Sequence, residues 1–304
     1  MQDSLDQVVL NFNKDALLVL NVCLAFIMFG VALELKVEHF KRIIKTPIPI
    51  FTGLVSQFVL LPACTFLLIL LLRPSASVAL GMILISACPG GNVSNFFSMM
   101  SNGNVALSVS ITAISTTMCV FMTPFNLALW SNFYAPTRDI LQEVNLDMSN
   151  VAVTIFMVLL IPLVLGMLLS AKRPDLTLKI SGIIRKISLM IFGAFVLGAL
   201  AANFDIFLNH IGAVILLVAL HNGMALLIGY ASAKVMKLSN ADRRSISIET
   251  GIQNSGLGLV LIFDFFQGLG GMAIIAAWWG IWHLTSGLTL SWYWSRKELV
   301  EDLA

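Results

Sequence analysis

Long apolar runs separated by short polar stretches fill most of this 304-residue chain. A helix that spans a bilayer needs about 20 mostly apolar residues, and nine runs reach that length. We expect spanning helices at residues 16–35, 48–72, 77–100, 104–132, 149–171, 181–203, 207–236, 243–266 and 270–295. Each run is much longer than a strand of a transmembrane barrel. The pattern therefore predicts an all-α polytopic membrane protein.

The composition indicates that lipid is the solvent of this chain. Hydrophobic residues make up 58% of the sequence and charged residues only 11%, whereas about a quarter of a soluble domain is charged. The net charge of +2 gives no sign of a nucleic-acid partner. We therefore expect a multi-pass protein of the cell membrane.

The basic residues predict the orientation of the helices, because cytoplasmic loops carry an excess of Lys and Arg. With the N-terminus outside, fifteen of the 18 basic residues fall in inner loops or at the C-terminal end. They are Lys36, Lys41, Arg42, Lys45, Lys172, Arg173, Lys179, Arg185, Lys186, Lys234, Lys237, Arg243, Arg244, Arg296 and Lys297. A count of eight or ten helices breaks this alternation. We expect nine helices, with the N-terminus outside and the C-terminus in the cytoplasm.

Two of the nine segments contain helix-breaking residues. Pro89, Gly90 and Gly91 interrupt the third segment, and Gly251 and Gly256 interrupt the eighth. Proline lacks a backbone donor and glycine favours unwinding. Backbone groups freed inside hydrocarbon must be satisfied by protein, water or ions. Two broken helices inside a membrane therefore predict a site that binds a solute or an ion.

The spacing of the two breaks predicts an internal repeat. The breaks are centred near residues 90 and 253, and about the same shift sets Gln57 opposite His221. Pairing the third helix with the eighth gives an offset of five helices. Because this number is odd, corresponding helices cross the membrane in opposite directions, and one copy is inverted relative to the other. We expect a first repeat of four helices over residues 1–147, broken near 89–92. A second repeat of five helices covers 148–304, broken near 251–255.

Glu249 lies inside the eighth segment, beside its break, whereas the other acidic residues lie in or near loops, tails or helix ends. An unpaired carboxylate at that depth is costly, and no Lys or Arg lies deep in any segment. A cation from solution is the partner that we expect. A protonated, structural Glu249 is the alternative.

Oxygen-bearing side chains suited to a hard cation surround Glu249 in this interpretation. Six of them flank the breaks or share a helix face with spacing of four: Ser94, Asn95, Ser108, Thr112, Gln253 and Asn254. Ser and Thr in membrane helices also bond to their own preceding turn, which is the structural alternative. His221, Asn222 and His283 are further intramembrane polar residues, with either a structural or a functional role.

Several motifs in order resemble the bile acid:sodium symporter family. They are Cys-Pro-Gly-Gly-Asn-Val-Ser-Asn (88–95), Gly-Asn-Val-Ala-Leu-Ser-Val (103–109), His-Asn-Gly (221–223), Ile-Glu-Thr-Gly-Ile-Gln-Asn-Ser-Gly (248–256) and Trp-His (282–283) with Ser-Gly (286–287). The resemblance runs from about residue 26 to 294. It implies a panel domain and a core domain, with the two broken helices crossing in the core.

The resemblance also implies the ligands. One sodium ion would take Ser94, Asn95, Ser108, Thr112 and Glu249. A second would take Gln57, Glu249, Gln253 and the backbone carbonyls of Thr250 and Ile252. A small organic anion such as a bile acid, pantoate or a keto acid would lie near Asn92, Asn254 and His283. The two Na+ ions are co-substrates, and no cofactor or catalytic residue is implied.

The chain departs from some bacterial relatives, which have ten helices, Thr at the position of Asn92 and Asn at the position of Leu284. These departures leave the cation ligands intact and leave the anion open. Alternating-access symport is our leading interpretation. A proton-coupled or uncoupled anion exporter of the same superfamily is the first alternative, and a non-transporting membrane receptor is the second. An intramembrane enzyme would need a nucleophile–base pair or a metal cluster at mid-depth, and we find neither in this sequence.

Overall fold

The computed structural model describes residues 5–6, 14–202 and 204–297, and within them the secondary structure is helical without a strand. The elements are α1 Lys14–Ala32, α2 Val37–Lys45, α3 Pro47–Val55, η1 Ser56–Leu60, α4 Leu61–Leu72, α5 Ala76–Ala87, α6 Val93–Met100, α7 Val105–Asn132, α8 Ala135–Val144, α9 Met148–Ile155, η2 Phe156–Leu160, α10 Ile161–Lys172, α11 Pro174–Ala202, α12 Phe204–Val235, α13 Asn240–Gly251, α14 Ser255–Phe265 and α15 Gly270–Ser295. The elements η1 and η2 are π-helical turns that join the helices on either side.

The predicted all-α polytopic architecture is confirmed. In the described residues, each of the nine predicted segments is covered by one helix or by helices that follow one another. Only α11 departs by more than a turn, because it begins at Pro174. Four described helices are long and apolar enough by themselves to cross a membrane: Pro47–Leu72, Val105–Asn132, Met148–Lys172 and Val214–Val235. Nine crossings remain a prediction.

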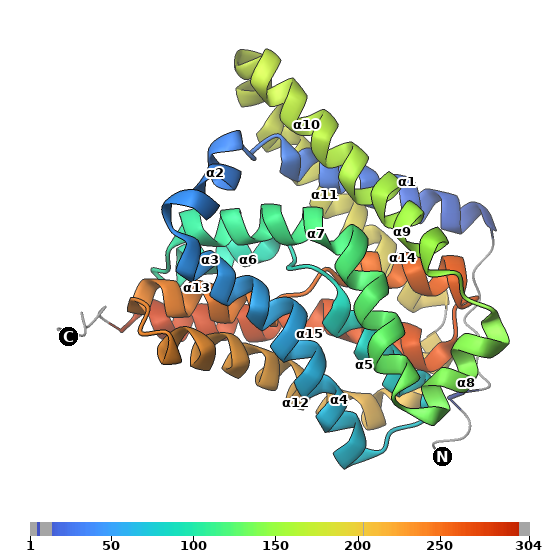
Figure 1. The fold of residues 1–304 in the computed structure, drawn as a ribbon. Helices are drawn as coiled ribbons and strands as arrows, with labels where there is room; N and C mark the ends of the chain where they lie inside the picture. Colours follow the sequence, from blue (N-terminus) through green and yellow to red (C-terminus); the bar gives the residue numbers. More distant parts are fainter. Residues whose placement is uncertain (1–4, 7–13, 203, 298–304) are drawn as a thin grey trace.

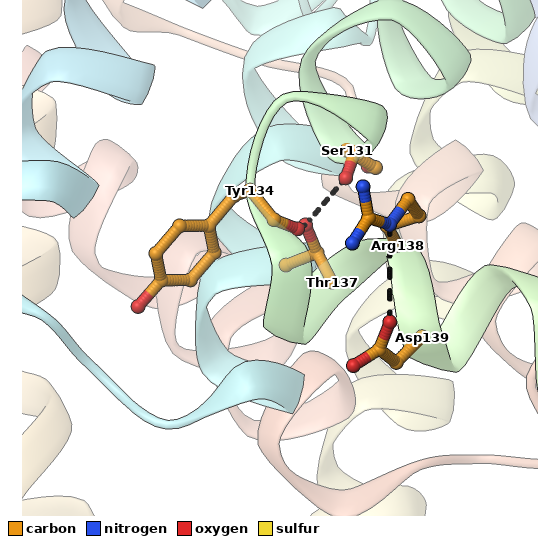
Figure 2. Close-up of polar contacts among 5 residues, drawn as sticks. All are labelled: Ser131, Tyr134, Thr137, Arg138 and Asp139. Carbon is orange, nitrogen blue, oxygen red and sulfur yellow. Dashed lines mark hydrogen bonds and ion pairs between the residues drawn. The ribbon is translucent and has the colours of Figure 1, made fainter.

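Two helices occupy stretches that the sequence suggested were loops. The amphipathic α2 follows α1, and its Ile44 is 85% exposed. The polar α8 follows α7 after a tight turn, shown in Figure 2. There the hydroxyl of Thr137 donates to the carbonyl oxygens of Ser131 at 2.8 Å and Tyr134 at 2.9 Å. Both helices are too short and too polar to have counted as spans.

The turn η1 lies just before a proline, and the carbonyl released by that proline is satisfied from another helix. Pro62 has no N–H to offer the carbonyl of Phe58, four residues earlier. The Asn126 amide on α7 donates to this carbonyl at 3.1 Å, and Asn126 is 2% exposed. The π turn thereby survives in a region without water, and it carries Gln57 into the protein interior.

The helices form two groups. In the first, α1 packs against both α10 and α11, and these helices gather at the top of Figure 1. The second group comprises α3 to α7 and α12 to α15 and contains both broken helices. Figure 1 shows α6 and α13 toward one end of this group and α5 and α14 toward the other. The two groups correspond to the expected panel and core.

Arg244 was expected in an inner loop, but the structure places it within helix α13. The helix α13 begins at Asn240, and the Arg244 side chain is only 6% exposed. Its guanidinium donates to the carbonyl oxygens of Ser101 at 2.7 Å, Trp294 at 3.1 Å and Lys297 at 3.2 Å. These carbonyls lie at the C-terminal ends of α6 and α15, where helices leave acceptors unsatisfied. Arg244 therefore joins the ends of three helices.

Candidate functional site

The two broken helices cross at their unwound segments. The first break separates α5 from α6, and the second separates α13 from α14. Gly90 and Gln253 form an antiparallel backbone bridge. The Gly91 N–H donates to the Ile252 carbonyl at 2.6 Å, and the Asn254 N–H donates to the Pro89 carbonyl at 2.9 Å. Each break thus satisfies backbone groups that the other has freed, as a water-poor environment requires.

Glycine is required at the crossing because the two unwound segments of the backbone approach each other so closely. A Cβ on Gly90 would lie 2.7 Å from the Oε2 atom of Glu249. A Cβ on Gly91 would lie 2.9 Å from the carbonyl oxygen of Gln253. Both distances are shorter than real Cβ contacts, and the obstructing atoms belong to the site itself. These two glycines let the Glu249 side chain lie directly against the first break.

Glu249 is the centre of a buried oxygen cluster drawn from three helices. The carboxylate is 1% exposed and lies on α13. The hydroxyls of Ser94 on α6 and Ser108 on α7 each donate to its Oε1 atom at 2.5 Å. The Thr112 hydroxyl lies 2.9 Å from Oε1 and 3.0 Å from Oε2. Spacing alone predicted that Ser108 and Thr112 share a face, and both do point at this carboxylate.

Asn95 completes this first oxygen cluster. Its Oδ1 atom lies 2.9 Å from the Ser108 hydroxyl oxygen and 3.3 Å from the Thr112 hydroxyl oxygen. The structure therefore brings together all five residues predicted for the first sodium ion. In the described part of the chain the Glu249 carboxylate is bonded by the hydroxyls of Ser94, Ser108 and Thr112, and no described basic side chain pairs with it. Carboxylate, amide and hydroxyl oxygens are the ligands that hard cations prefer, and this donor set fits a sodium ion.

The second predicted set is connected through amides and backbone. Gln57 donates to the Oε1 atom of Gln253 at 2.7 Å and to the Cys88 carbonyl at 2.8 Å. Gln253 in turn donates to the Thr250 carbonyl at 2.7 Å. The Gln57 Oε1 atom is buried and has no hydrogen-bond partner among the residues that the structure describes. A buried acceptor without a donor is unusual, and it fits a cation nearby.

The second set differs from its prediction in one respect. Hydrogen bonds tie Glu249 to the first set, and none joins it to Gln57 or Gln253 in the described part of the chain. The Ile252 carbonyl, also predicted as a ligand, accepts from the Gly91 N–H. The sharing of Glu249 between two cations therefore stays a prediction.

The three predicted substrate residues lie around the crossing and do not hydrogen-bond to one another. Asn92 and Asn254 are at the N-caps of α6 and α14. Asn254 accepts from the Leu257 N–H at 3.0 Å, while its Nδ2 donor is buried without a partner in the described part of the chain. The Nδ1 atom of His283 is also buried and has no partner among the described residues. Asn92 points toward α1, where its Nδ2 atom lies 3.5 Å from the sulfur of Met28.

Asn222 and Thr123 also hold the breaks, although sequence reasoning gave them no such role. Asn222 on α12 donates to the Gly251 carbonyl at 2.7 Å. Thr123 on α7 donates to the Ala87 carbonyl at 2.7 Å. Both acceptors are the last residues of first half-helices. A polar side chain in a helix that neighbours a break was the available signal, but the identity of its backbone acceptor was not.

Transition-metal chemistry has no support in the described residues, because none of their His, Cys, Asp and Glu side chains form a group of three or more that could hold a metal ion. Two broken helices that cross, pair their unwound backbone and place an oxygen cluster beside the crossing define a class of membrane transporters built on discontinuous helices. The chain belongs to the sodium bile acid symporter family, whose sequence model matches residues 21–210.

Several relatives are sodium-dependent transporters or sodium cotransporters by name. The chain is 31% identical over 278 residues to an uncharacterized sodium-dependent transporter, YocS, of Bacillus subtilis, covering 91% of this chain and 83% of that protein. It is 33% identical over 245 residues to the probable chloroplastic sodium/metabolite cotransporter BASS2 of Oryza sativa, covering 81% and 56%. It is 30% identical over 278 residues to the sodium/bile acid cotransporter 5 of Rattus norvegicus, covering 86% and 59%.

The chain spans little more than half the length of the last two relatives. Family and relatives identify a sodium-coupled membrane transporter of a small organic substrate rather than an enzyme, with Na+ as co-substrate. The predicted family, fold class and general function are thereby confirmed.

Proposed function

We propose that this transporter carries a small organic anion inward with two sodium ions, by alternating access between the panel and the core. The observation that carries the proposal is the Glu249 cluster. Its carboxylate is buried among four oxygen-bearing side chains, and no basic side chain of the described residues pairs with it. One cation would bind there, and the other would bind at Gln57, Gln253 and the carbonyls of Thr250 and Ile252, with Glu249 shared between the two.

Coupling follows from electrostatics at the crossing. An organic anion near Asn92, Asn254 and His283 would lie beside a buried carboxylate, which repels it when no cation is bound. Bound cations would neutralise Glu249 and hold the unwound segments together. The N-terminal ends of α6 and α14 then offer the anion backbone N–H groups and the positive ends of two helix dipoles. The anion needs no buried Lys or Arg in this scheme.

Similar contacts at the two breaks support the proposed inverted repeats, 1–147 and 148–304. In the first, Gln57 donates to the carbonyl of Cys88, which caps α5. In the second, Asn222 donates to the carbonyl of Gly251, which ends α13. Each amide comes from the helix before the break. Two inverted repeats are expected to make such equivalent contacts, because corresponding helices have corresponding neighbours in each repeat.

The charge pattern supports a cell-membrane protein with its N-terminus outside and its C-terminus in the cytoplasm. A bile acid, pantoate or a keto acid are the candidate substrates that the family resemblance suggests. One relative is named as a sodium/metabolite cotransporter and another as a sodium/bile acid cotransporter, and each name describes the substrate of that relative only. A panel of such anions, tested for uptake with and without a sodium gradient, would identify the class.

A stability measurement tests the cation site independently of the substrate. Sodium should raise the melting temperature of the purified protein more than potassium at equal ionic strength. A ligand that binds only the folded state adds about 2.7 kcal/mol at 100 times its dissociation constant. Glu249→Ala should remove the sodium-specific increase. Glu143→Ala, which removes an exposed carboxylate on α8, is the matched control and should keep it.

Two outcomes would count against the proposal. An unchanged sodium response in Glu249→Ala would remove this cluster as a cation site. Stabilisation by acid instead of sodium, with uptake driven by a proton gradient, would favour the proton-coupled alternative, in which Glu249 carries the proton.

A further inference from the structure

Asn222 links the second break to α15. It is fully buried on α12. Its Nδ2 atom donates to the Gly251 carbonyl at 2.7 Å, and its Oδ1 atom accepts from the Ser286 hydroxyl at 2.7 Å. One side chain thus contacts the end of α13 on one side and α15 on the other. None of the proposed cation or substrate ligands is Asn222 or Ser286.

The carbonyl that Asn222 holds lies between two proposed cation ligands. Three successive carbonyls at this break each have a different donor. The Thr250 carbonyl accepts from the Gln253 side chain, the Gly251 carbonyl from Asn222, and the Ile252 carbonyl from the Gly91 N–H. The carbonyl of Gly251 is the only one of the three that is held from α12. Because adjacent peptide planes share their Cα atoms, fixing this carbonyl restricts how its two neighbours can turn.

The other end of the link is next to the proposed substrate residue on α15. The Ser286 hydroxyl also lies 3.3 Å from the carbonyl of His283, one turn earlier in the same helix. Farther along α15, a Cβ on Gly287 would meet the Phe97 ring and Ile252, so this turn packs directly on both broken helices. The Asn222–Ser286 link therefore joins the Gly251 carbonyl to the turn that carries His283.

We infer that Asn222 and Ser286 form a positioning pair that couples the second cation set to the substrate-bearing turn of α15. The inference rests on the proposed function and extends it to a pair of residues that touch neither ligand. Buried amide groups are costly unless both ends are satisfied. Here one amide satisfies a half-helix end and a hydroxyl at once, so a change at either partner is felt by the other.

Hydrogen exchange with sodium as the probe tests the coupling without a known substrate. Peptides covering 249–257 and 279–290 are followed by mass spectrometry in sodium and in potassium. In the parent protein, sodium should slow exchange in both peptides. Ser286→Ala cuts the link to α15 and keeps the Asn222–Gly251 bond. It should keep sodium protection at 249–257, with the sodium Kd within about threefold, and lose it at 279–290.

Matched variants separate coupling from general loosening. Asn222→Ala should raise the sodium Kd about tenfold, equivalent to about 1.4 kcal/mol, because it frees the Gly251 carbonyl. Ser286→Thr retains the hydroxyl and should restore protection of 279–290. Thr289→Ala removes an exposed hydroxyl of the same helix, which bonds only to its own preceding turn. It should behave as the parent protein does.

Two results would overturn the inference. One is full sodium protection of 279–290 in Ser286→Ala. The other is an unchanged sodium Kd in Asn222→Ala, or, if that variant does not fold, in Asn222→Leu, which has a similar volume and removes both the donor and the acceptor without adding a charge. Failure of the proposed function is recognised separately, since the parent protein would then show no sodium-specific protection at 249–257.

Discussion

Gly90 and Gln253 lie opposite one another in an antiparallel bridge at the point where the two broken helices cross. They come from segments that are far apart in the sequence, and each lies inside a break. The same backbone approach sets the Glu249 carboxylate against Gly90. The crossing and the oxygen cluster are therefore one structural unit, and a change to the backbone at Gly90 should be felt at the cation site.

We expect Gly90→Ala to weaken sodium binding strongly. The added methyl group would lie 2.7 Å from the Oε2 atom of Glu249, so the carboxylate or the break must move. The sodium-specific increase in melting temperature should fall or vanish. Gly223→Ala is the control, because nothing lies within 4 Å of a Cβ at that position. An undiminished sodium response in Gly90→Ala would contradict this arrangement of the site.

A second prediction concerns the carbonyl released by Pro62. Asn126→Ala should lower stability by about 1 kcal/mol, because it leaves the buried Phe58 carbonyl without its donor. Pro62→Ala supplies a backbone N–H, so the same Asn126→Ala change should cost less in that background. Unfolding of the four proteins forms a double-mutant cycle. Asn132→Ala, which removes an exposed amide bonded only to its own helix, is the control. Equal costs in both backgrounds would contradict the account.

Much of the fold could be predicted from the sequence because lipid imposes simple rules. Length and apolarity located the nine segments, and Pro89, Gly90 and Gly251 located the two breaks. The short helices α2 and α8 were missed because neither reaches the length or apolarity of a span. The π turn at Ser56–Leu60 was missed because its only sequence sign is a proline that α-helices also accept near their start.

The candidate site was predictable only as far as side-chain chemistry reveals it. Glu249, Ser108 and Thr112 stood out as polar residues inside apolar segments, and they do converge. A hydrogen bond from a side chain to a backbone carbonyl was not predictable in the same way. Asn222 on Gly251 is such a case, because every residue has a carbonyl and the sequence does not say which is left unpaired.

The orientation predicts which ends of the protein react from outside. Figure 1 shows α2 and α8 at opposite ends of the long helix α7. Lys41 on α2 and Glu143 on α8 are exposed, so cysteines there should be accessible. In intact cells an impermeant thiol reagent should label Glu143→Cys and spare Lys41→Cys. The parent protein, with its own four cysteines, gives the background. Labelling of Lys41→Cys alone would mean that the orientation is reversed.

The last prediction separates substrate binding from helix capping at Asn254. Its Oδ1 atom caps α14 by accepting from the Leu257 N–H, while its Nδ2 donor is buried without a partner among the described residues. Asn254→Ser keeps a capping oxygen and replaces the longer Nδ2 amide donor by a hydroxyl on a shorter side chain, whereas Asn254→Ala removes the capping oxygen and the donor together.

If the free donor serves the anion, both variants should reduce sodium-driven uptake of labelled organic anions to a similar degree. Sodium should still raise the melting temperature of both, because Asn254 is assigned to the substrate. Only the alanine variant should also lose about 1 kcal/mol of stability with the cap. A purely structural role predicts the opposite pattern, in which the serine variant transports normally. Normal uptake by a protein with alanine at Asn92, Asn254 and His283 together would remove this region as the substrate site, because it leaves none of the three proposed donors.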